Sequence, residues 1–555
     1  MDGATAEVIR SYLGSAAEEM RATLIRTAFN PVIYEVLDFG ISIYSDELDL
    51  IAEAPGLTHF LGANDYAIRK GVEYVGADNV EPGDVVLMNY PYWNAAHSYD
   101  ATLFSAFYAE GATSPTAYLC VRAHWMDLGA KDPGYVLDST SVFQEGILFP
   151  GTKIFKRGRA DHELLELIRF NSRLPDLVIG DVHAQVAALR TGERRLGEIY
   201  ARYGKATIDE AIQTILDHGE EQTRRALLAL PQGSWTATDV LDDDGIDDTP
   251  VPMQVTVTIA NGELTVDFAG SAGATAGPVN MPFGATLAMC KVALKALTTP
   301  DEPGTGGHMR PLRVLAEPGT LFHAISPAPT FTLWTGIVAL ELIFKAVAQG
   351  MEGRVAASTG GDVPGFMMVG IHPDTGEMFA VSNNEPVGWG GTPRHDGANG
   401  TMHLSASIVR NTPIEVLESK TLMLVESLEF RTDSGGAGRR RGGAGLRRMI
   451  RFLGEGEFLS VVKKTRTAPW GLAGGRDGLP NGFVLNPGTP QERAVSTHRT
   501  AVKTGDRILV LSGGGGGHGD PKDRDRERVL EDVREGYVSV EAAARDYGVT
   551  AEEPT

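Results

Sequence analysis

The opening of the chain places apolar side chains about one helical turn apart, which predicts an amphipathic helix over residues 4–29. Asn30-Pro31 ends this helix, because the residue before a proline disfavours helical geometry. Polar and apolar residues then alternate over residues 37–43 and again over residues 117–123, a pattern typical of β-strands. The first part of the chain is therefore predicted to mix helices with strands.

The middle of the chain changes to helical periodicity over residues 159–225. A strand-rich part follows from Trp235 onward. In it, residues 251–259 alternate, the pair Asn261-Gly262 is a strong hairpin signal, and residues 264–268 supply the returning strand. A short helix over residues 539–547 closes the chain.

These patterns predict a mixed α/β (α+β) fold for a large, multilobed chain, with a helical middle section and strand-rich N-terminal and C-terminal parts. With 555 residues, the chain is long enough for more than one domain. We expect four segments: residues 1–158 with mixed strands and helices, residues 159–232 as the helical section, residues 233–520 as a strand-rich α/β region with glycine-rich loops, and residues 521–555 as a C-terminal helical tail.

Charge and hydropathy exclude two classes of partner. The net charge of -22 argues against nucleic acids and anionic membranes, since both bind clustered lysine and arginine. Residues 331–348 form the most apolar long stretch, but Glu341 and Lys345 interrupt it, so we expect a buried helix there and no membrane span. With Cys120 and Cys290 as the only cysteines and an acidic start unlike a signal peptide, we expect a cytoplasmic protein.

A run of glycines over residues 513–519, GGGGGHG, resembles a phosphate-binding loop only in composition. A nucleotide loop needs a lysine and then a serine or threonine after the glycines, so that the ammonium group meets the phosphates. Asp520-Pro521 follows here instead. We therefore expect no nucleotide site on this chain.

The strongest chemical signal lies between Asn89 and Asp127, where two His-x-x-Asp pairs flank a strand-like segment. His97 and Asp100 form the first pair, and His124 and Asp127 form the second. Neutral imidazole and carboxylate together suit divalent ions such as zinc or manganese, and such a mixed set leaves positions open for water or substrate. The alternative is that each histidine caps a loop or hydrogen-bonds a backbone carbonyl. The repeated pairs favour a metal site within residues 1–158.

Two further acids lie near these pairs in sequence or in the expected fold. Asp38 stands at the entrance of the predicted strand 37–43, where it fits either a metal ligand or a turn-forming aspartate. Glu145 belongs to a loop rich in turn formers, residues 132–151, which directly follows the candidate site and could line a pocket.

Several motifs in one order resemble the hydantoinase B/oxoprolinase family over nearly the whole chain, from Ala4 to Gly548. They are LDFGIS, GDVVLMNYPYWNAAHSYDAT, RAHWMDLG, VFQEGILFPG, DSGGAGRRRGG, LSGGGGGHGDP and the tail VLEDVREGYVSVEAAARDYG. The resemblance implies a mixed α/β subunit that carries a metal. It also implies a hetero-oligomer with a hydantoinase A-type ATPase subunit, which would bind ATP and magnesium.

The resemblance also implies roles for single residues. The family's metal ligands would fall on Asp38, His97, Asp100 and His124. Asp127 would then orient His124 through its other ring nitrogen, and either Asp127 or Glu145 would handle a proton as the catalytic acid or base.

One departure from the family pattern concerns the substrate. Many hydrolase members have a glycine pair ahead of the first histidine, where this chain has Asn94-Ala95-Ala96. Aromatic residues surround that position, and we expect Tyr92, Trp93 and Trp125 to build an aromatic substrate pocket.

By this resemblance, the expected function is the metal-dependent step of an ATP-dependent cyclic amide hydrolase of the hydantoinase, oxoprolinase or lactamase type. The partner would phosphorylate the amide oxygen before ring opening. The alternatives are a subunit of an ATP-dependent ketone carboxylase of the acetone or acetophenone type, and a noncatalytic scaffold for the ATPase partner.

Overall fold

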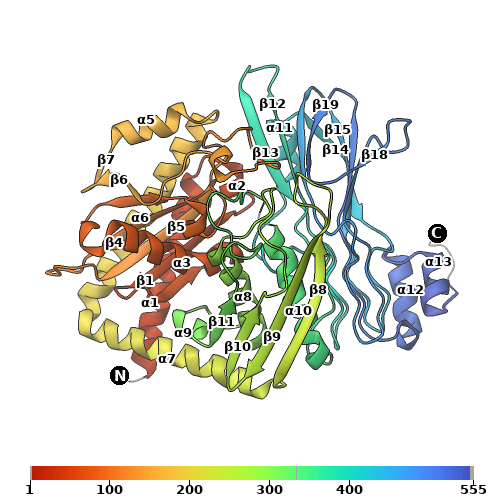
Figure 1. Cartoon of the computed structure of the whole chain (residues 1–555), viewed down its shortest axis with the longest axis horizontal. Coiled ribbons are helices and arrows are strands. Elements are labelled where there is room, and N and C mark those ends of the chain that lie inside the picture. The colour runs from red at the N-terminus through yellow and green to blue at the C-terminus, as the bar shows by residue number, and fades with distance from the viewer. Residues whose placement is uncertain (1–2, 333, 551–555) are drawn as a thin grey trace.

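The computed structural model describes residues 3–332 and 334–550. Residues 1–2 and 551–555, at the ends of the first and last predicted segments, lie outside the described residues, as does Leu333 within the predicted helix 331–348. Figure 1 shows the N-terminal part at the left, a sheet with two packed helices in the centre, and the C-terminal sheets at the right. Helices and strands alternate as a mixed α/β fold requires, in agreement with the sequence.

The N-terminal part is built on a seven-stranded sheet with the order β2-β1-β5-β4-β3-β6-β7. Its strands are β1 Phe39–Ser45, β2 Leu50–Ala54, β3 Val85–Met88, β4 Asp100–Phe107, β5 Ala117–His124, β6 Thr152–Lys156 and β7 Arg159–Ala160. Every residue of β1, β4 and β5 is buried, because helices cover both faces. Helices α1 (Gly3–Thr27) and α6 (Pro175–Tyr203) pack on one face, and α3 (Thr58–Val75) packs on the other.

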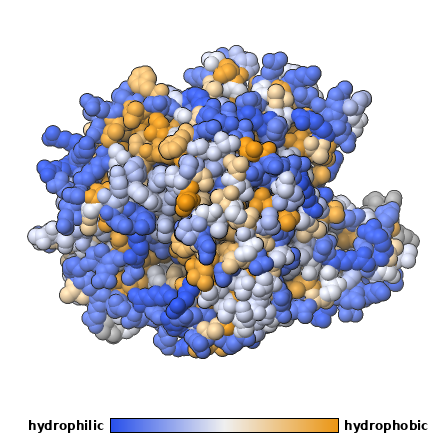
Figure 2. Space-filling view, in the orientation of Figure 1, coloured by the Kyte–Doolittle hydropathy of each residue, from blue (hydrophilic) through white to orange (hydrophobic). Residues whose placement is uncertain are grey.

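The predicted helical stretch of residues 159–225 contains three helices, α5 His162–Phe170, α6, and α7 Lys205–Ala229. Figure 2 shows a largely hydrophilic face with apolar atoms gathered at the upper left, in the region of α5. On this helix Leu167 and Phe170 are exposed. Within the described residues, the structure contains no helix whose length and apolar character would allow it to cross a membrane.

A second sheet has the order β11-β10-β9-β8, with β8 Gly233–Leu241, β9 Val251–Ala260, β10 Glu263–Asp267 and β11 Leu312–Leu315. The predicted hairpin is confirmed, since Asn261 and Gly262 join β9 to β10 with φ angles of 54° and 74°. Helices α8 (Phe283–Thr298) and α10 (Thr335–Met351) pack together, and α10 lies against β8 and β9. Helix α10 is the buried helix predicted from the most apolar stretch.

Two further sheets share one hydrophobic core in the C-terminal part. The four-stranded sheet β13-β12-β16-β19 contains β12 Gly365–Ile371, β13 Met378–Asn384, β16 Gly456–Val461 and β19 His498–Val502. The five-stranded sheet β14-β15-β20-β17-β18 contains β14 Met423–Phe430, β15 Leu446–Phe452, β17 Gly482–Leu485, β18 Arg493–Val495 and β20 Arg507–Leu511. Helices α12 (Arg526–Arg534) and α13 (Val540–Ala542) follow these sheets and lie at the right of Figure 1.

Short helical segments connect these elements. They are α2 Pro31–Tyr34, α4 Pro91–Asn94, α9 Gly306–Met309, α11 Ile414–Lys420, η1 Ala77–Asn79, η2 Val142–Gln144, η3 Pro521–Asp523 and η4 Ala543–Tyr547.

The glycine run 513–517 packs inside a bundle of extended segments, and we call this the glycine bundle. Its backbone exchanges hydrogen bonds with Ser358, Gly388, Gly391 and Gly443, among other residues of the surrounding glycine-rich segments. A Cβ on Gly515 would lie 2.0 Å from the carbonyl oxygen of Trp389, so a side chain cannot fit. The glycines therefore allow backbones to approach closely, which is a structural role.

Candidate metal centre

The two ends of the central hairpin bring the predicted ligands together. Asp100 is the first residue of β4 and His124 is the last of β5, and the antiparallel register places them opposite each other. His97 precedes β4 in a turn that follows α4, where Ala95 adopts a left-handed conformation (φ 59°) and ends the helix. Because both strands belong to the buried sheet, these positions are rigid.

His97, Asp100 and His124 form a buried cluster in which one ligand atom from each lies within 4.8 Å of the others. The Nε2 atom of His97 lies 3.4 Å from one carboxylate oxygen of Asp100, and Nδ1 of His124 lies 3.0 Å from the other. The ring of Phe331 stacks on that of His97 at 4.8 Å and restricts its rotation. Two imidazoles and a carboxylate at this spacing fit a divalent ion such as zinc or manganese.

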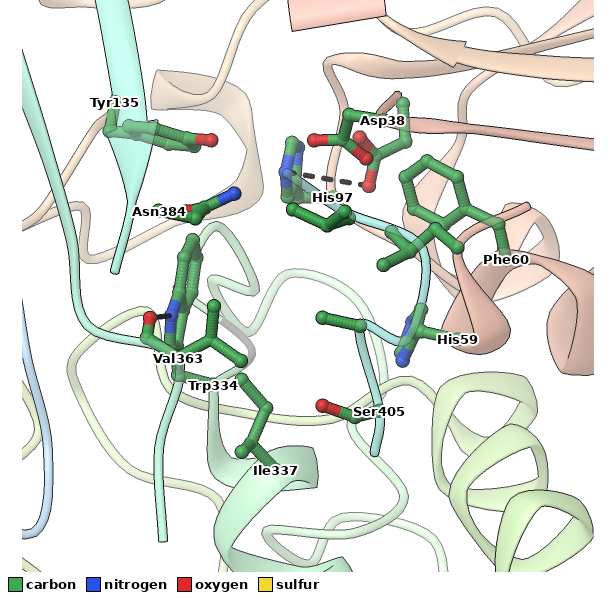
Figure 3. A pocket seen from close by; sticks show the side chains of 14 residues that line it. Asp38, His59, Phe60, His97, Tyr135, Trp334, Ile337, Val363, Asn384 and Ser405 are labelled. Atoms are coloured by element: carbon green, nitrogen blue, oxygen red, sulfur yellow. Dashed lines mark hydrogen bonds and ion pairs between the residues drawn. The ribbon is translucent and has the colours of Figure 1, made fainter. Parts of the chain in front are cut away.

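Asp38 lies beside this cluster, directly before β1 (Figure 3). Its backbone carbonyl accepts a hydrogen bond from the amide of His124 at 3.2 Å. One of its carboxylate oxygens is buried and has no hydrogen-bond partner, which is costly unless a cation or proton compensates it. This oxygen could serve as a fourth metal ligand, so the residues present suit the metal that the sequence predicts.

Burial and charge set the protonation of these groups. Burial lowers the pKa of His97 to about 3, against the attraction of Asp100, so its ring is neutral and able to bind a metal. Burial raises the pKa of Asp38 to about 7, against the attraction of His124. Burial opposes the charge on Asp100 as well, but the histidines on either side outweigh it and lower the pKa of this carboxyl group.

The cluster opens on a cavity of about 100 Å³ (Figure 3). Its lining comes from the start of α3, the N-terminal end of α10, and later loops that are distant in sequence. The lining residues are Asp38, Leu57, His59, Phe60, His97, Asp100, Tyr135, Trp334, Ile337, Val363, Asn384, Ser405, Ala406 and Val409. Apolar side chains predominate, and none of these residues is a lysine or arginine.

The expectation that Asp127 orients His124 is wrong. The carboxylate of Asp127 accepts hydrogen bonds from Tyr99 and from the guanidinium of Arg173, at 2.9 Å each. The Nδ1 atom of His124 faces Asp100 instead. Asp127 is buried beneath the cluster and does not line the cavity, so it stabilises the loop that carries Arg173.

Glu145 is also placed away from the cavity. Its carboxylate accepts hydrogen bonds from the hydroxyl of Ser139 at 2.7 Å and from the amides of Thr330 at 2.8 Å and Phe331 at 3.1 Å. Burial, which these bonds only partly offset, raises the pKa of Glu145 to about 7. The residue joins two loops, and a proton-carrying role has no direct path to the cavity.

The three aromatic residues predicted to form the substrate pocket do not line the cavity. The hydroxyl of Tyr92 donates to the carbonyl of Ala328, Trp93 packs against Tyr74 and Tyr90, and Trp125 is fully buried. The aromatic walls are instead Phe60, Tyr135 and Trp334. No local pattern in the sequence marks these three, because they come from separate elements that only the fold brings together.

The fold and the site together define a mixed α/β chain with a buried cluster of two histidines and one aspartate, beside a second aspartate, that faces a small, apolar cavity. The chain belongs to the hydantoinase B/oxoprolinase family, whose model matches residues 2–521.

Three comparisons illustrate this membership. The chain is 30% identical to one component of a putative D-/L-hydantoinase from Pseudomonas sp. (strain NS671), over 99% of this chain and 95% of that one. It is similar to the crystal structure of the ATP-dependent caprolactamase from Pseudomonas jessenii, with a TM-score of 0.91 and 26% identity over 100% of this chain and 97% of that one. A nucleotide-free acetone carboxylase structure shares the fold, with a TM-score of 0.88 and 18% identity over 99% and 79% of the two chains.

Proposed function

We propose that this chain is the metal-dependent subunit of an ATP-dependent cyclic amide hydrolase. A hydantoinase A-type partner would phosphorylate the amide oxygen of the substrate, and the cavity described above would hold the activated ring. The observation that carries the proposal is the buried His97–Asp100–His124 cluster beside the unpartnered oxygen of Asp38. The relatives named for hydantoinase and caprolactamase support the choice of substrate class.

Four residues of the chain would hold the metal, and apolar residues would line the cavity beside it. His97 and His124 offer nitrogen ligands, and Asp38 and Asp100 offer oxygen ligands. A zinc or manganese ion held there would polarise a carbonyl group and lower the pKa of water. The apolar side chains of Leu57, Phe60 and Ile337 would exclude other water from a small ring in the cavity.

Metal analysis of the purified chain tests the first half of the proposal. We expect about one equivalent of zinc or manganese in the wild type, and loss of most of it in His97→Ala and His124→Ala. His395→Ala is the matched control, because His395 is exposed and does not line the cavity. Unchanged metal content in both cluster variants would refute the metal site and favour the scaffold alternative.

Turnover by the complex that copurifies with this chain tests the second half. With ATP and hydantoin but no bicarbonate, we expect ring opening coupled to ATP hydrolysis. If the complex instead consumes a ketone with ATP and bicarbonate and leaves cyclic amides intact, it is a ketone carboxylase and the proposed reaction is wrong.

A further inference from the structure

The wall of the cavity away from the metal cluster carries two polar residues, His59 and Ser405, that the sequence did not single out. Figure 3 shows them on the side of the cavity opposite Tyr135, with Ser405 far from His97. The two residues are neighbours, since the amide of His59 donates to the carbonyl of Ser405 at 3.2 Å. Both are more than nine-tenths buried, at 8% and 4% exposure, so their polar atoms need partners.

His59 can offer the cavity only a hydrogen-bond acceptor. Its Nε2 atom is buried and has no hydrogen-bond partner in the protein. The ring interacts with the backbone carbonyl of Ala95, which accepts the proton of the other nitrogen. Burial lowers the pKa of His59 to about 4, so the ring is neutral and the free Nε2 carries a lone pair.

Ser405 is held as a second acceptor by a chain of buried hydrogen bonds. Glu341 on α10 accepts from Nε2 of His403 at 3.0 Å, because a carboxylate has no hydrogen to give. The Nδ1 atom of His403 is then free to accept, and both the amide (3.1 Å) and the hydroxyl (2.8 Å) of Ser405 point at it. With its hydrogen directed to His403, the hydroxyl oxygen of Ser405 has only lone pairs for the cavity.

Further hydrogen bonds keep Glu341 in its ionised form. It accepts hydrogen bonds from the hydroxyl groups of Ser358 and Thr359, at 2.8 Å each. Burial alone would raise the pKa of Glu341, but His403 and these hydroxyl groups outweigh burial and lower it. The carboxylate therefore stays ionised, and the tautomer of His403 stays set.

We propose that His59 and Ser405, which we call the acceptor pair, recognise the ring N–H groups of a neutral cyclic ureide or imide whose carbonyl faces the metal cluster. Two neighbouring acceptors select a ligand that presents N–H groups to this side of the cavity. No lysine or arginine is among the lining residues, so a substrate carboxylate on the side of His59 and Ser405 would have no cationic side chain beside it. Glu341 and His403 are positioning residues, since they act on the ligand only through Ser405. This inference rests on the proposed function, because it specifies the substrate of the same cavity.

Binding of hydantoin to the purified, full-length chain tests the inference, measured by titration calorimetry or ligand-observed NMR without ATP. We expect hydantoin to bind at least about tenfold more tightly than its N-methylated forms, in which a buried acceptor loses its donor. We expect 5-oxoproline, which carries a carboxylate, to bind more weakly still. Equal affinity for these ligands, or no binding of hydantoin, would overturn the inference.

Variants assign the effect to the acceptor pair. Ser405→Ala and His59→Phe should each weaken hydantoin binding by about five- to tenfold, the usual effect of one lost hydrogen bond, and leave bound metal unchanged. Ser405→Thr keeps the hydroxyl group and should restore affinity. Ser407→Ala is the matched control, because Ser407 lies two residues away, is exposed and does not line the cavity.

The positioning role of His403 is tested by combining changes. If His403 acts through Ser405, His403→Gln weakens binding in the wild type and has no further effect in Ser405→Ala. Equal effects in both backgrounds would show a merely structural role and overturn this step. Since binding is measured without turnover, failure of the proposed hydrolysis and failure of the acceptor pair give separate results.

Discussion

The glycine bundle packs against the segment that holds Glu341, and one substitution tests whether this packing supports the cavity. A Cβ on Gly390 would lie 1.8 Å from the carbonyl oxygen of Ala357, whereas ordinary contact begins at 3.4 Å. Gly390→Ala therefore forces one of the two segments to move by about 1.6 Å, the difference between those distances. The segment that is pushed continues into Ser358 and Thr359, whose hydroxyl groups hold Glu341.

The loss of stability follows from the hydrogen bonds that such a shift breaks. The amide of Ala357 donates to Gly391 at 2.9 Å, and the carbonyl of Ser358 accepts from Gly516 at 2.8 Å. Overpacking costs about 1–3 kcal/mol, and leaving one of these buried groups unpaired costs about 1–3 kcal/mol more. We therefore expect Gly390→Ala to lower the free energy of unfolding by about 2–6 kcal/mol and to weaken hydantoin binding, because Glu341 no longer holds His403.

Denaturant unfolding of the two alanine variants measures this. Gly482→Ala on β17 is the matched control, because a Cβ there meets no atom within 4 Å. We expect the control to match the wild type within about 0.5 kcal/mol. If Gly390→Ala also stays within that margin, or if it unfolds early yet binds hydantoin normally, the bundle does not support the cavity as we have argued.

Three further predictions concern residues around the site. Burial raises the pKa of Asp362 to about 7, from 3.8. The folded state therefore binds the proton of Asp362 more tightly than the unfolded state does. As the pH rises from 4 to 7, the wild type should lose up to about 4 kcal/mol of unfolding free energy relative to Asp362→Asn, measured by denaturant unfolding at each pH. Trp334→Ala should weaken hydantoin binding by about tenfold because a cavity wall is lost, whereas Trp125→Phe should leave it unchanged, and equal effects would contradict the assigned walls. Asp127→Asn should keep its metal by elemental analysis and lose about 2 kcal/mol of stability, since Arg173 loses its charged partner; loss of the metal would return Asp127 to the site.

The grouping of His97, Asp100 and His124 was largely predictable because these residues are close in sequence and lie at or near the ends of strands. Alternation over residues 117–123 predicts a strand, and that strand does end at His124. The resemblance to the family added Asp38, which no local pattern distinguishes from a turn former. The sequence could not show that β4 and β5 pair in the register that sets Asp100 against His124, and the wrong role given to Asp127 followed from this.

The cavity walls were not predictable for a different reason. Tyr135, Trp334, Asn384 and Ser405 come from separate segments, and each lies in a loop or at the end of an element whose pattern predicts no pocket. His59 likewise stands near the start of a helix, where a histidine more often has a structural role. Only the packing of α3, α10 and the later loops turns these side chains toward one space.

The histidine–aspartate cluster and the acceptor pair therefore differ in how readily they can tolerate substitutions. The cluster is fixed by a buried sheet, so replacing one of its residues disturbs neighbours on both faces. The acceptor pair depends on Glu341, which lies on another element, and on the glycine bundle behind Ser358. Changes on that side can alter which ring the cavity accepts without moving His97 or His124. By our proposals, the chemistry and the choice of substrate would be carried by different parts of one chain, and substitutions at the acceptor pair should change specificity without loss of bound metal.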